Sequence, residues 1–393
     1  MGTASTMACI TAALGLIPLK GGASAPAVSS ARLRIAESTG RNAVAAAEVR
    51  RTPQSIISRE SVFNAITVLQ AIGGSTNGVV HLLAIVNRHP ELQGKISLDD
   101  FDLVGRRTPM LIDLKPSGDN YMTDFHQAGG MVALLHTLRP LLHLSARTIT
   151  GQTLGEVLDE SGPFRPFSLS SQIIRPLSDP LYAHSSLVVL HGNLAPDGAV
   201  LKASASKDRG LLAHSGPAVV FENSEDLALR IDSPDLPVTA ASVLVLKSIG
   251  PVGNPGMPEA GLIPIPRKLA SQGVTDMLRI SDGRMSGTAG GTIVLHVSPE
   301  AAVDGSPLGI VENGDSIQCD AEQRLLSVDL SQEEMQTRWM VKRYAHKLNS
   351  AADRVSKRGP LVASARGYRK MYVENVNQAH HGADFKFMTA NGQ

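Results

Sequence analysis

Residues 247–297 read KSIGPVGNPGMPEAGLIPIPRKLASQGVTDMLRISDGRMSGTAGGTIVLHV, and the rest of the chain is best understood from this stretch. Two glycine-rich segments, GPVGNPGMPE at 250–259 and SDGRMSGT at 281–288, lie between apolar runs that predict strands. Glycine allows close approach of the backbone to a ligand, and proline fixes φ. Loops of this kind on a rigid frame often carry binding and catalytic groups. We therefore expect site residues in both segments.

The first segment ends in a single carboxylate, Glu259. A glutamate held on a rigid loop can bind a hard metal ion or act as a general acid. Alternatively, Glu259 is the first charge of a helix that starts at Ala260, where the helix dipole favours a negative group. The residues alone do not separate these two interpretations.

The second segment surrounds the hydroxyl of Ser286 with glycines at 283, 287, 290 and 291. A serine becomes a nucleophile or base only with an activating partner, and no histidine is adjacent to supply one. The alternative is a tight anion-binding or structural turn, which the residues alone favour.

Composition limits the classes of function. The 393 residues suffice for two domains. The 37 basic and 36 acidic residues give a net charge of +1, so nothing favours binding to nucleic acid or to an anionic membrane. An apolar run of about 18 residues is lacking, so we expect no spanning helix. Two cysteines, Cys9 and Cys319, exclude a disulfide framework and predict a cytoplasmic protein, with the mitochondrion as alternative.

The apolar periodicity predicts two domains joined by a proline-rich connection. We expect a first domain over 1–165, a connection over 166–180 and a β-barrel-like domain with carboxy-terminal helices over 181–393. The first domain has a predicted strand at 108–114, and 192–198 is a predicted loop. Strands of the second domain are expected at 186–191, 199–203, 218–221, 241–246, 292–297, 310–311, 316–319 and 325–330.

Six motifs in order resemble one family of enzymes. They are GTASTM at 2–7, GGSTNGVVHLLAI at 73–85, DFHQAGG at 124–130, LSDPLYAHSSLVVLHGNLAPDGAVLKAS at 177–204 and the two segments quoted above. Together they resemble the dihydroxy-acid dehydratase and phosphogluconate dehydratase family, iron–sulfur hydro-lyases that include pentonate dehydratases. The residues SGDNYMTDF at 117–125 resemble the sugar-acid branch. A series of long motifs in order is more specific than one glycine pattern.

The resemblance implies a role for each matching residue. Glu259 would bind Mg²⁺, and Ser286, as an alkoxide, would remove the proton from C2 of the substrate. Thr288 would contact the substrate, and Ser75, Thr76 and Asn77 would line the site; alternatively, these three only cap the following helix. The family's cofactors are a [2Fe-2S] cluster, whose iron acts on the departing 3-hydroxyl, and Mg²⁺.

The amino terminus departs from the family pattern. In the family, the cluster cysteines and further metal ligands precede GTASTM, whereas this chain begins at that motif. Neither Cys9 nor Cys319 matches a ligand position, so the cluster ligands are not present in this chain. The resemblance therefore implies an incomplete α/β amino-terminal domain followed by a β-barrel-like carboxy-terminal domain. We expect a truncated dehydratase that is inactive alone.

Three functions follow as hypotheses. The first is dehydration of a sugar acid, such as a pentonate, to a 2-keto-3-deoxy acid. A second is dehydration of dihydroxyisovalerate to ketoisovalerate in branched-chain amino-acid biosynthesis. The third is a catalytically dead binding or assembly protein without a cluster. In all three the partner is a small acid, and the resemblance implies a homodimer or homotetramer.

Overall fold

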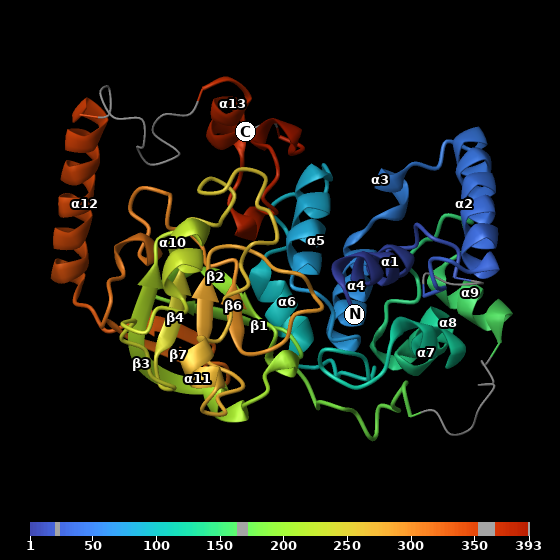
Figure 1. The fold of residues 1–393 in the computed structure, drawn as a ribbon. Coiled ribbons are helices and arrows are strands. Elements are labelled where there is room, and N and C mark those ends of the chain that lie inside the picture. The colour runs from blue at the N-terminus through green and yellow to red at the C-terminus, as the bar shows by residue number, and fades with distance from the viewer. Residues whose placement is uncertain (20–23, 163–171, 353–365, 392–393) are drawn as a thin grey trace. The chain divides into compact units, whose positions relative to one another are not determined.

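The computed structural model describes residues 1–19, 24–162, 172–352 and 366–391 (Figure 1). The chain divides into two compact units. Unit 1 comprises Met1–Leu82, His89–Leu187 and Ser286–Thr288, and unit 2 comprises Leu83–Arg88, Val188–Met285 and Ala289–Gln393. Unit 1 thus takes three residues from the second half of the sequence. The predicted connection at 166–180 lies partly outside the described residues.

The described part of unit 1 is built from helices. They are α1 (Thr3–Ala13), α2 (Ser30–Glu48), α3 (Pro53–Ile56), α4 (Arg59–Ala71), α5 (Asn77–Arg88, shared with unit 2), α6 (Leu98–Gly105), α7 (Met122–Gln127), α8 (Gly130–Thr137), η1 (Arg139–Leu141) and α9 (Leu154–Ser161). Helix α4 packs against α1 and α6 and is buried from Ser61 to Ala71. Its start is closed by a capping box, because Ser58 and Ser61 each accept the other's backbone N–H through a side-chain oxygen.

The strand predicted at 108–114 is wrong. Met110 and Ile112 make only isolated bridges, to Tyr182 and Ile174, and no strand forms among the described residues of unit 1. Met110 to Ile112 are fully buried, so the apolar run marks burial and not a sheet. The described part of unit 1 is therefore helical and not α/β.

Unit 2 contains the expected barrel. Eight strands close in the order β1-β2-β6-β5-β4-β3-β7-β8 (Figure 1). They are β1 (Val188–Gly192), β2 (Ala195–Leu201), β3 (Ala213–Phe221), β4 (Val243–Leu246), β5 (Arg279–Ser281), β6 (Ile293–Leu295), β7 (Ser316–Asp320) and β8 (Leu325–Val328). The neighbours β3, β4, β5 and β6 are parallel, whereas β1 with β2, β2 with β6, β3 with β7 and β7 with β8 are antiparallel.

Alternation along the strands separates two apolar layers of unit 2. Val220 and Val245 belong to a cluster with members on every side of the barrel, so they point inward. Their neighbours Phe221 and Leu246 belong to a second cluster that includes Leu227 of α10 (Ser224–Arg230). The parallel strands are thus buried on both faces, as such strands usually are.

Two local predictions for unit 2 are wrong. The loop expected at 192–198 shrinks to a turn, because Gly192 pairs with Ala195 and β2 starts there. The strand expected at 310–311 is replaced by the 3₁₀ helix η4 (Leu308–Ile310). The remaining elements of unit 2 are η2 (Ala203–Ala205), η3 (Arg209–Leu212), α11 (Arg267–Ala270), α12 (Gln332–Ala352), α13 (Gly367–Asn375), η5 (Ala379–His381) and η6 (Lys386–Met388).

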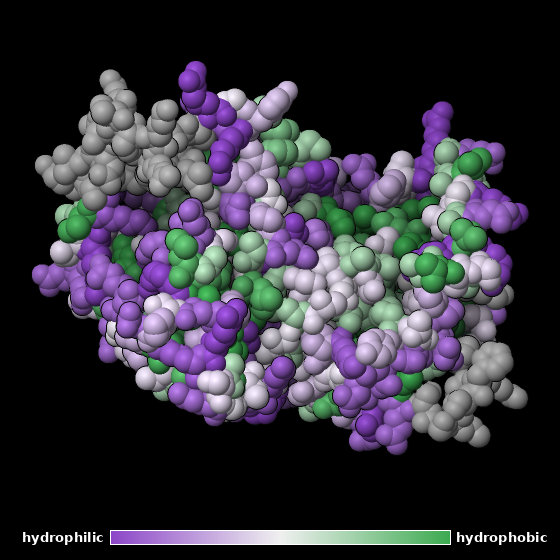
Figure 2. All heavy atoms as spheres, viewed as in Figure 1, coloured by the Kyte–Doolittle hydropathy of each residue, from purple (hydrophilic) through white to green (hydrophobic). Residues whose placement is uncertain are grey.

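On the face shown in Figure 2, hydrophilic side chains are widespread, and smaller hydrophobic areas lie between them. Among the described residues, none of the helices combines the length and the apolar character needed to cross a bilayer.

Candidate active site

Two buried carboxylates fix the backbone of the first glycine-rich segment. Asp282, directly after β5, is fully buried and accepts hydrogen bonds from the backbone N–H groups of Ser248 at 3.0 Å and Ile249 at 2.9 Å. A third bond comes from Ala301 N–H at 2.8 Å. Burial raises the pKa of Asp282, and these hydrogen bonds oppose the rise. Asp282 therefore ties the start of the segment to the end of β5.

Glu300 holds the next turn of the same segment. Its carboxylate accepts the backbone N–H groups of Val252 and Gly253, both at 2.8 Å, and the side chain of Gln378 at 2.7 Å. Burial and then the charge of Asp282 raise the pKa of Glu300 to about 7. Sequence reasoning gave neither acid a role. Their position just after strand ends was the available signal.

The structure shows how Glu259 is presented. Residues 259–266 form no helix, and α11 starts only at Arg267, so the interpretation of Glu259 as a helix-start charge is wrong. Glu259 is exposed. Next to it, the Arg284 guanidinium donates to the Met257 carbonyl, and Gly261 N–H donates to the Arg284 carbonyl at 2.8 Å. The start of the second segment thus anchors the end of the first.

Residues 286–288 cluster with unit 1. The hydroxyls of Ser286 and Thr288 lie 2.9 Å apart, and Thr288 N–H also donates to Ser286 Oγ at 3.4 Å. Gly287 lies against Ser75: a side chain at position 287 would begin 2.6 Å from the Ser75 Cβ. The absence of a side chain at 287 therefore lets Ser286 and Thr288 approach the GGSTN turn.

The residues of that turn are buried and bonded to one another. Ser75 and Asn77 are inaccessible to solvent, and Thr76 is nearly so. Ser75 Oγ accepts Asn77 N–H at 3.2 Å at the start of α5 and lies 3.1 Å from Thr3 Oγ1, which also accepts from Asn77 Nδ2. These contacts fit the helix-capping alternative. Substrate binding by Ser75, Thr76 and Asn77 stays a prediction.

Comparison with known proteins supports the family named by the motifs. The model of the dihydroxy-acid/6-phosphogluconate dehydratase C-terminal region matches residues 172–383, and the model of the N-terminal region matches residues 1–157. The chain belongs to the dihydroxy-acid/6-phosphogluconate dehydratase family. The expected resemblance is thereby confirmed.

Relatives of this chain carry names of two substrate classes. It is 41% identical to L-arabinonate dehydratase of Rhizobium leguminosarum over 96% of this chain and 61% of the relative. It is 40% identical to 6-deoxy-6-sulfo-D-gluconate dehydratase of Pseudomonas putida over 99% of this chain and 63% of the relative. It is also 40% identical to dihydroxy-acid dehydratase 1 of Methanosarcina acetivorans, over 86% of this chain and 59% of the relative. The chain thus spans about three fifths of the length of these relatives, and the identities do not separate the substrates.

The described residues of this chain do not fit an iron–sulfur cluster. Cys9 in α1 and Cys319 in β7 are both buried, and burial raises the pKa of each thiol to about 12. Clusters bind thiolates, which such burial disfavours. Within the described ranges, no three His, Cys, Asp or Glu side chains are grouped to hold a metal ion. Glu259 would supply a magnesium ion with one hard oxygen ligand only.

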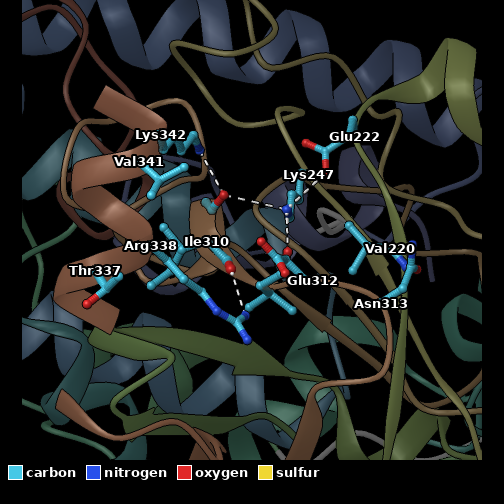
Figure 3. A pocket seen from close by; sticks show the side chains of 12 residues that line it. Val220, Glu222, Lys247, Ile310, Glu312, Asn313, Thr337, Arg338, Val341 and Lys342 are labelled. Atoms are coloured by element: carbon cyan, nitrogen blue, oxygen red, sulfur yellow. Dashed lines mark hydrogen bonds and ion pairs between the residues drawn. The ribbon is translucent and has the colours of Figure 1, made fainter. Parts of the chain in front are cut away.

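Unit 2 also has a pocket of about 720 Å³ (Figure 3). Lys247 Nζ donates to Val311 O at 2.7 Å and pairs with Glu222 at 3.1 Å. Lys342 Nζ donates to Gly309 O at 2.8 Å, and Arg338 donates to Ile310 O at 3.3 Å. The accepting carbonyls lie at the end of η4, where a helix leaves them without internal partners. Arg338 and Lys342 therefore dock α12 on η4.

Proposed function

We propose that the protein carrying this chain is a hydro-lyase that converts a 2,3-dihydroxy sugar acid, such as a pentonate, to a 2-keto-3-deoxy acid. Family membership supports the reaction class. The sugar-acid form of residues 117–125 and the names of the two sugar-acid relatives favour this substrate class.

The observation that carries the proposal is the hydroxyl pair of the second segment. Ser286 is the proposed base for the C2 proton. Thr288 offers its Oγ1, 2.9 Å away, and its backbone N–H to Ser286 Oγ, and two such donors stabilise a negative charge on that oxygen. We assign Thr288 as a substrate contact as well, with Ser75, Thr76 and Asn77 lining the site.

The cofactors belong to the proposal for the complete enzyme. A [2Fe-2S] cluster and Mg²⁺, when bound, would supply Lewis-acid chemistry, and Glu259 is the proposed magnesium ligand of this chain. Since the described residues do not provide cluster ligands, we assign no step of this chain to the cluster.

The test is a substrate comparison with a serine variant. The complete enzyme that carries this chain, prepared without oxygen and supplied with iron, sulfide and Mg²⁺, is incubated with L-arabinonate or 2,3-dihydroxyisovalerate, and the 2-keto product is measured as its semicarbazone. We expect product from L-arabinonate. Ser286→Ala should lower the rate by roughly 1,000-fold or more, because the base is lost, whereas the exposed control Ser271→Ala should not change it.

Other outcomes would select an alternative. Product from dihydroxyisovalerate alone would favour the branched-chain function. Tight binding of the acid without turnover would favour the binding or assembly protein. An unchanged rate in Ser286→Ala would remove Ser286 from the proposed role.

A further inference from the structure

Lys202 is a buried lysine whose ammonium group has no partner in the part of the chain that the structure describes. Only 4% of the residue is exposed, and among the described residues nothing accepts a hydrogen bond from its Nζ. It directly follows β2 within the family motif at 177–204. A buried polar group without a partner is rare in proteins and calls for an explanation.

The strand register shows which face of the barrel Lys202 occupies. Leu201 pairs with Val294, and both belong to the interior cluster. Side chains alternate along a strand, so Val200 and Lys202 point outward. Val200 pairs with Leu295. Lys202 therefore lies on the outer face that β2 shares with β6, toward Ile293.

Residues within or next to the two glycine-rich segments pack on this same outer face of the barrel. Met285, which precedes Ser286, packs with Ile293 and Leu295, and Ala289 packs against them. Gly261, two residues after Glu259, lies against Leu295. These neighbours all belong to unit 2, and none of them brings a negative charge.

The missing counter-charge has a physical consequence. Removing an ammonium group from water is unfavourable unless an anion or several oxygen acceptors surround it. Burial accordingly lowers the pKa of Lys202 to about 7. An anion that reached Nζ would reverse this effect and hold the ammonium form.

We propose that Lys202 binds the anionic substrate, its ammonium group pairing with the carboxylate of the sugar acid. The proposal rests on the proposed function, since it takes that acid as the ligand. Lysine at this position would then select acids over neutral polyols of the same size. Lys202 is a binding residue in this scheme and takes no part in the proton transfer.

The test compares a charged and a neutral probe on three proteins. Calorimetry measures binding of L-arabinonate and of L-arabinitol, which lacks the carboxylate, to the wild type, Lys202→Met and the control Lys207→Met. Lys207 lies five residues further on and is exposed. We expect Lys202→Met to weaken L-arabinonate binding roughly 10- to 100-fold, the usual effect of losing a hydrogen bond to a charged group. L-arabinitol binding should not change, and Lys207→Met should behave as wild type.

A second measurement uses the wild-type protein alone, so it does not depend on the folding of a variant. In protein with ¹³Cε-labelled lysine, saturating L-arabinonate should raise the pH at which the Lys202 signal titrates, and L-arabinitol should not. An unmoved titration, or equal L-arabinonate affinity in wild type and Lys202→Met, overturns the role of Lys202 and leaves the proposed function standing. A wild type that does not prefer L-arabinonate to L-arabinitol counts against both.

Discussion

Two lysines of unit 2, Lys202 and Lys247, are buried to almost the same extent but differ in the partners of their ammonium groups. Lys247 is 3% exposed and Lys202 is 4% exposed. Lys247 donates to two backbone carbonyls, Val311 O at 2.7 Å and Gly309 O at 3.5 Å, and forms an ion pair with Glu222 (Figure 3). Lys202 has no acceptor among the described residues. Burial of a charge therefore does not by itself indicate a binding site, whereas burial without a partner does.

The largest expected effect is a gain in stability on removing the charge of Lys202. Its pKa falls from 10.5 in the unfolded chain to about 7 in the folded one. At pH 7 the unfolded state therefore binds more protons, and Lys202→Met should raise the free energy of unfolding by about 4 kcal/mol. Because the wild type regains stability as pH rises from about 7 to about 10.5, the gain should fall below about 1 kcal/mol at pH 10.

Urea unfolding of both proteins at pH 7 and pH 10 measures this difference. Lys207→Met, the exposed control, should leave the free energy of unfolding unchanged at both values. A loss of stability in Lys202→Met at pH 7 would show that Nζ has partners in solution, and the contrast with Lys247 would disappear.

Replacing Lys247 should instead lower the free energy of unfolding. Lys247→Met leaves the Val311 carbonyl without its lysine donor, whereas the Gly309 carbonyl keeps Lys342 Nζ at 2.8 Å. An unsatisfied buried acceptor costs about 1–3 kcal/mol, so the free energy of unfolding should fall by about 1–3 kcal/mol. The same urea titration tests it. If Lys247→Met is as stable as the wild type, water replaces the ammonium group and this lysine is not structural.

A smaller change in stability is expected from the titration of Glu300. This side chain is buried and partnered like Lys247 but carries the opposite charge. Its folded pKa of about 7 exceeds the ordinary 4.5, so the folded state binds more protons and the wild type should lose stability between pH 4.5 and pH 7. Glu300→Gln should remove this pH dependence.

Hydrogen exchange sharpens the test of Glu300. Glu300→Gln presents its amide N–H₂ to donors, so exchange of the Val252 and Gly253 amides should quicken by about 10-fold, while the Val243–Leu246 strand stays protected. Unchanged exchange at 252 and 253 would mean that the segment holds its shape without this carboxylate.

The sequence by itself determined the family, the barrel and the local caps. The motifs at 250–259 and 281–288 are contiguous in the chain, and alternation of apolar residues marks most barrel strands, because both are local properties of the sequence. The capping box at Ser58 and Ser61 was predictable for the same reason: its partners are three residues apart.

Only the tertiary structure decided which groups have partners. Glu300 accepts hydrogen bonds from the backbone of Val252 and Gly253, which lie 48 and 47 positions earlier in the sequence, and Ser75 lies against Gly287. Sequence spacing could not reveal these contacts. The run at 108–114 had the composition of a strand, but its partners in the described fold, such as Ile174 and Tyr182, make only isolated bridges and no continuous ladder. Lys202 and Lys247 look alike in the sequence. Their difference arises because the availability of an acceptor depends on the segments that fold around each side chain.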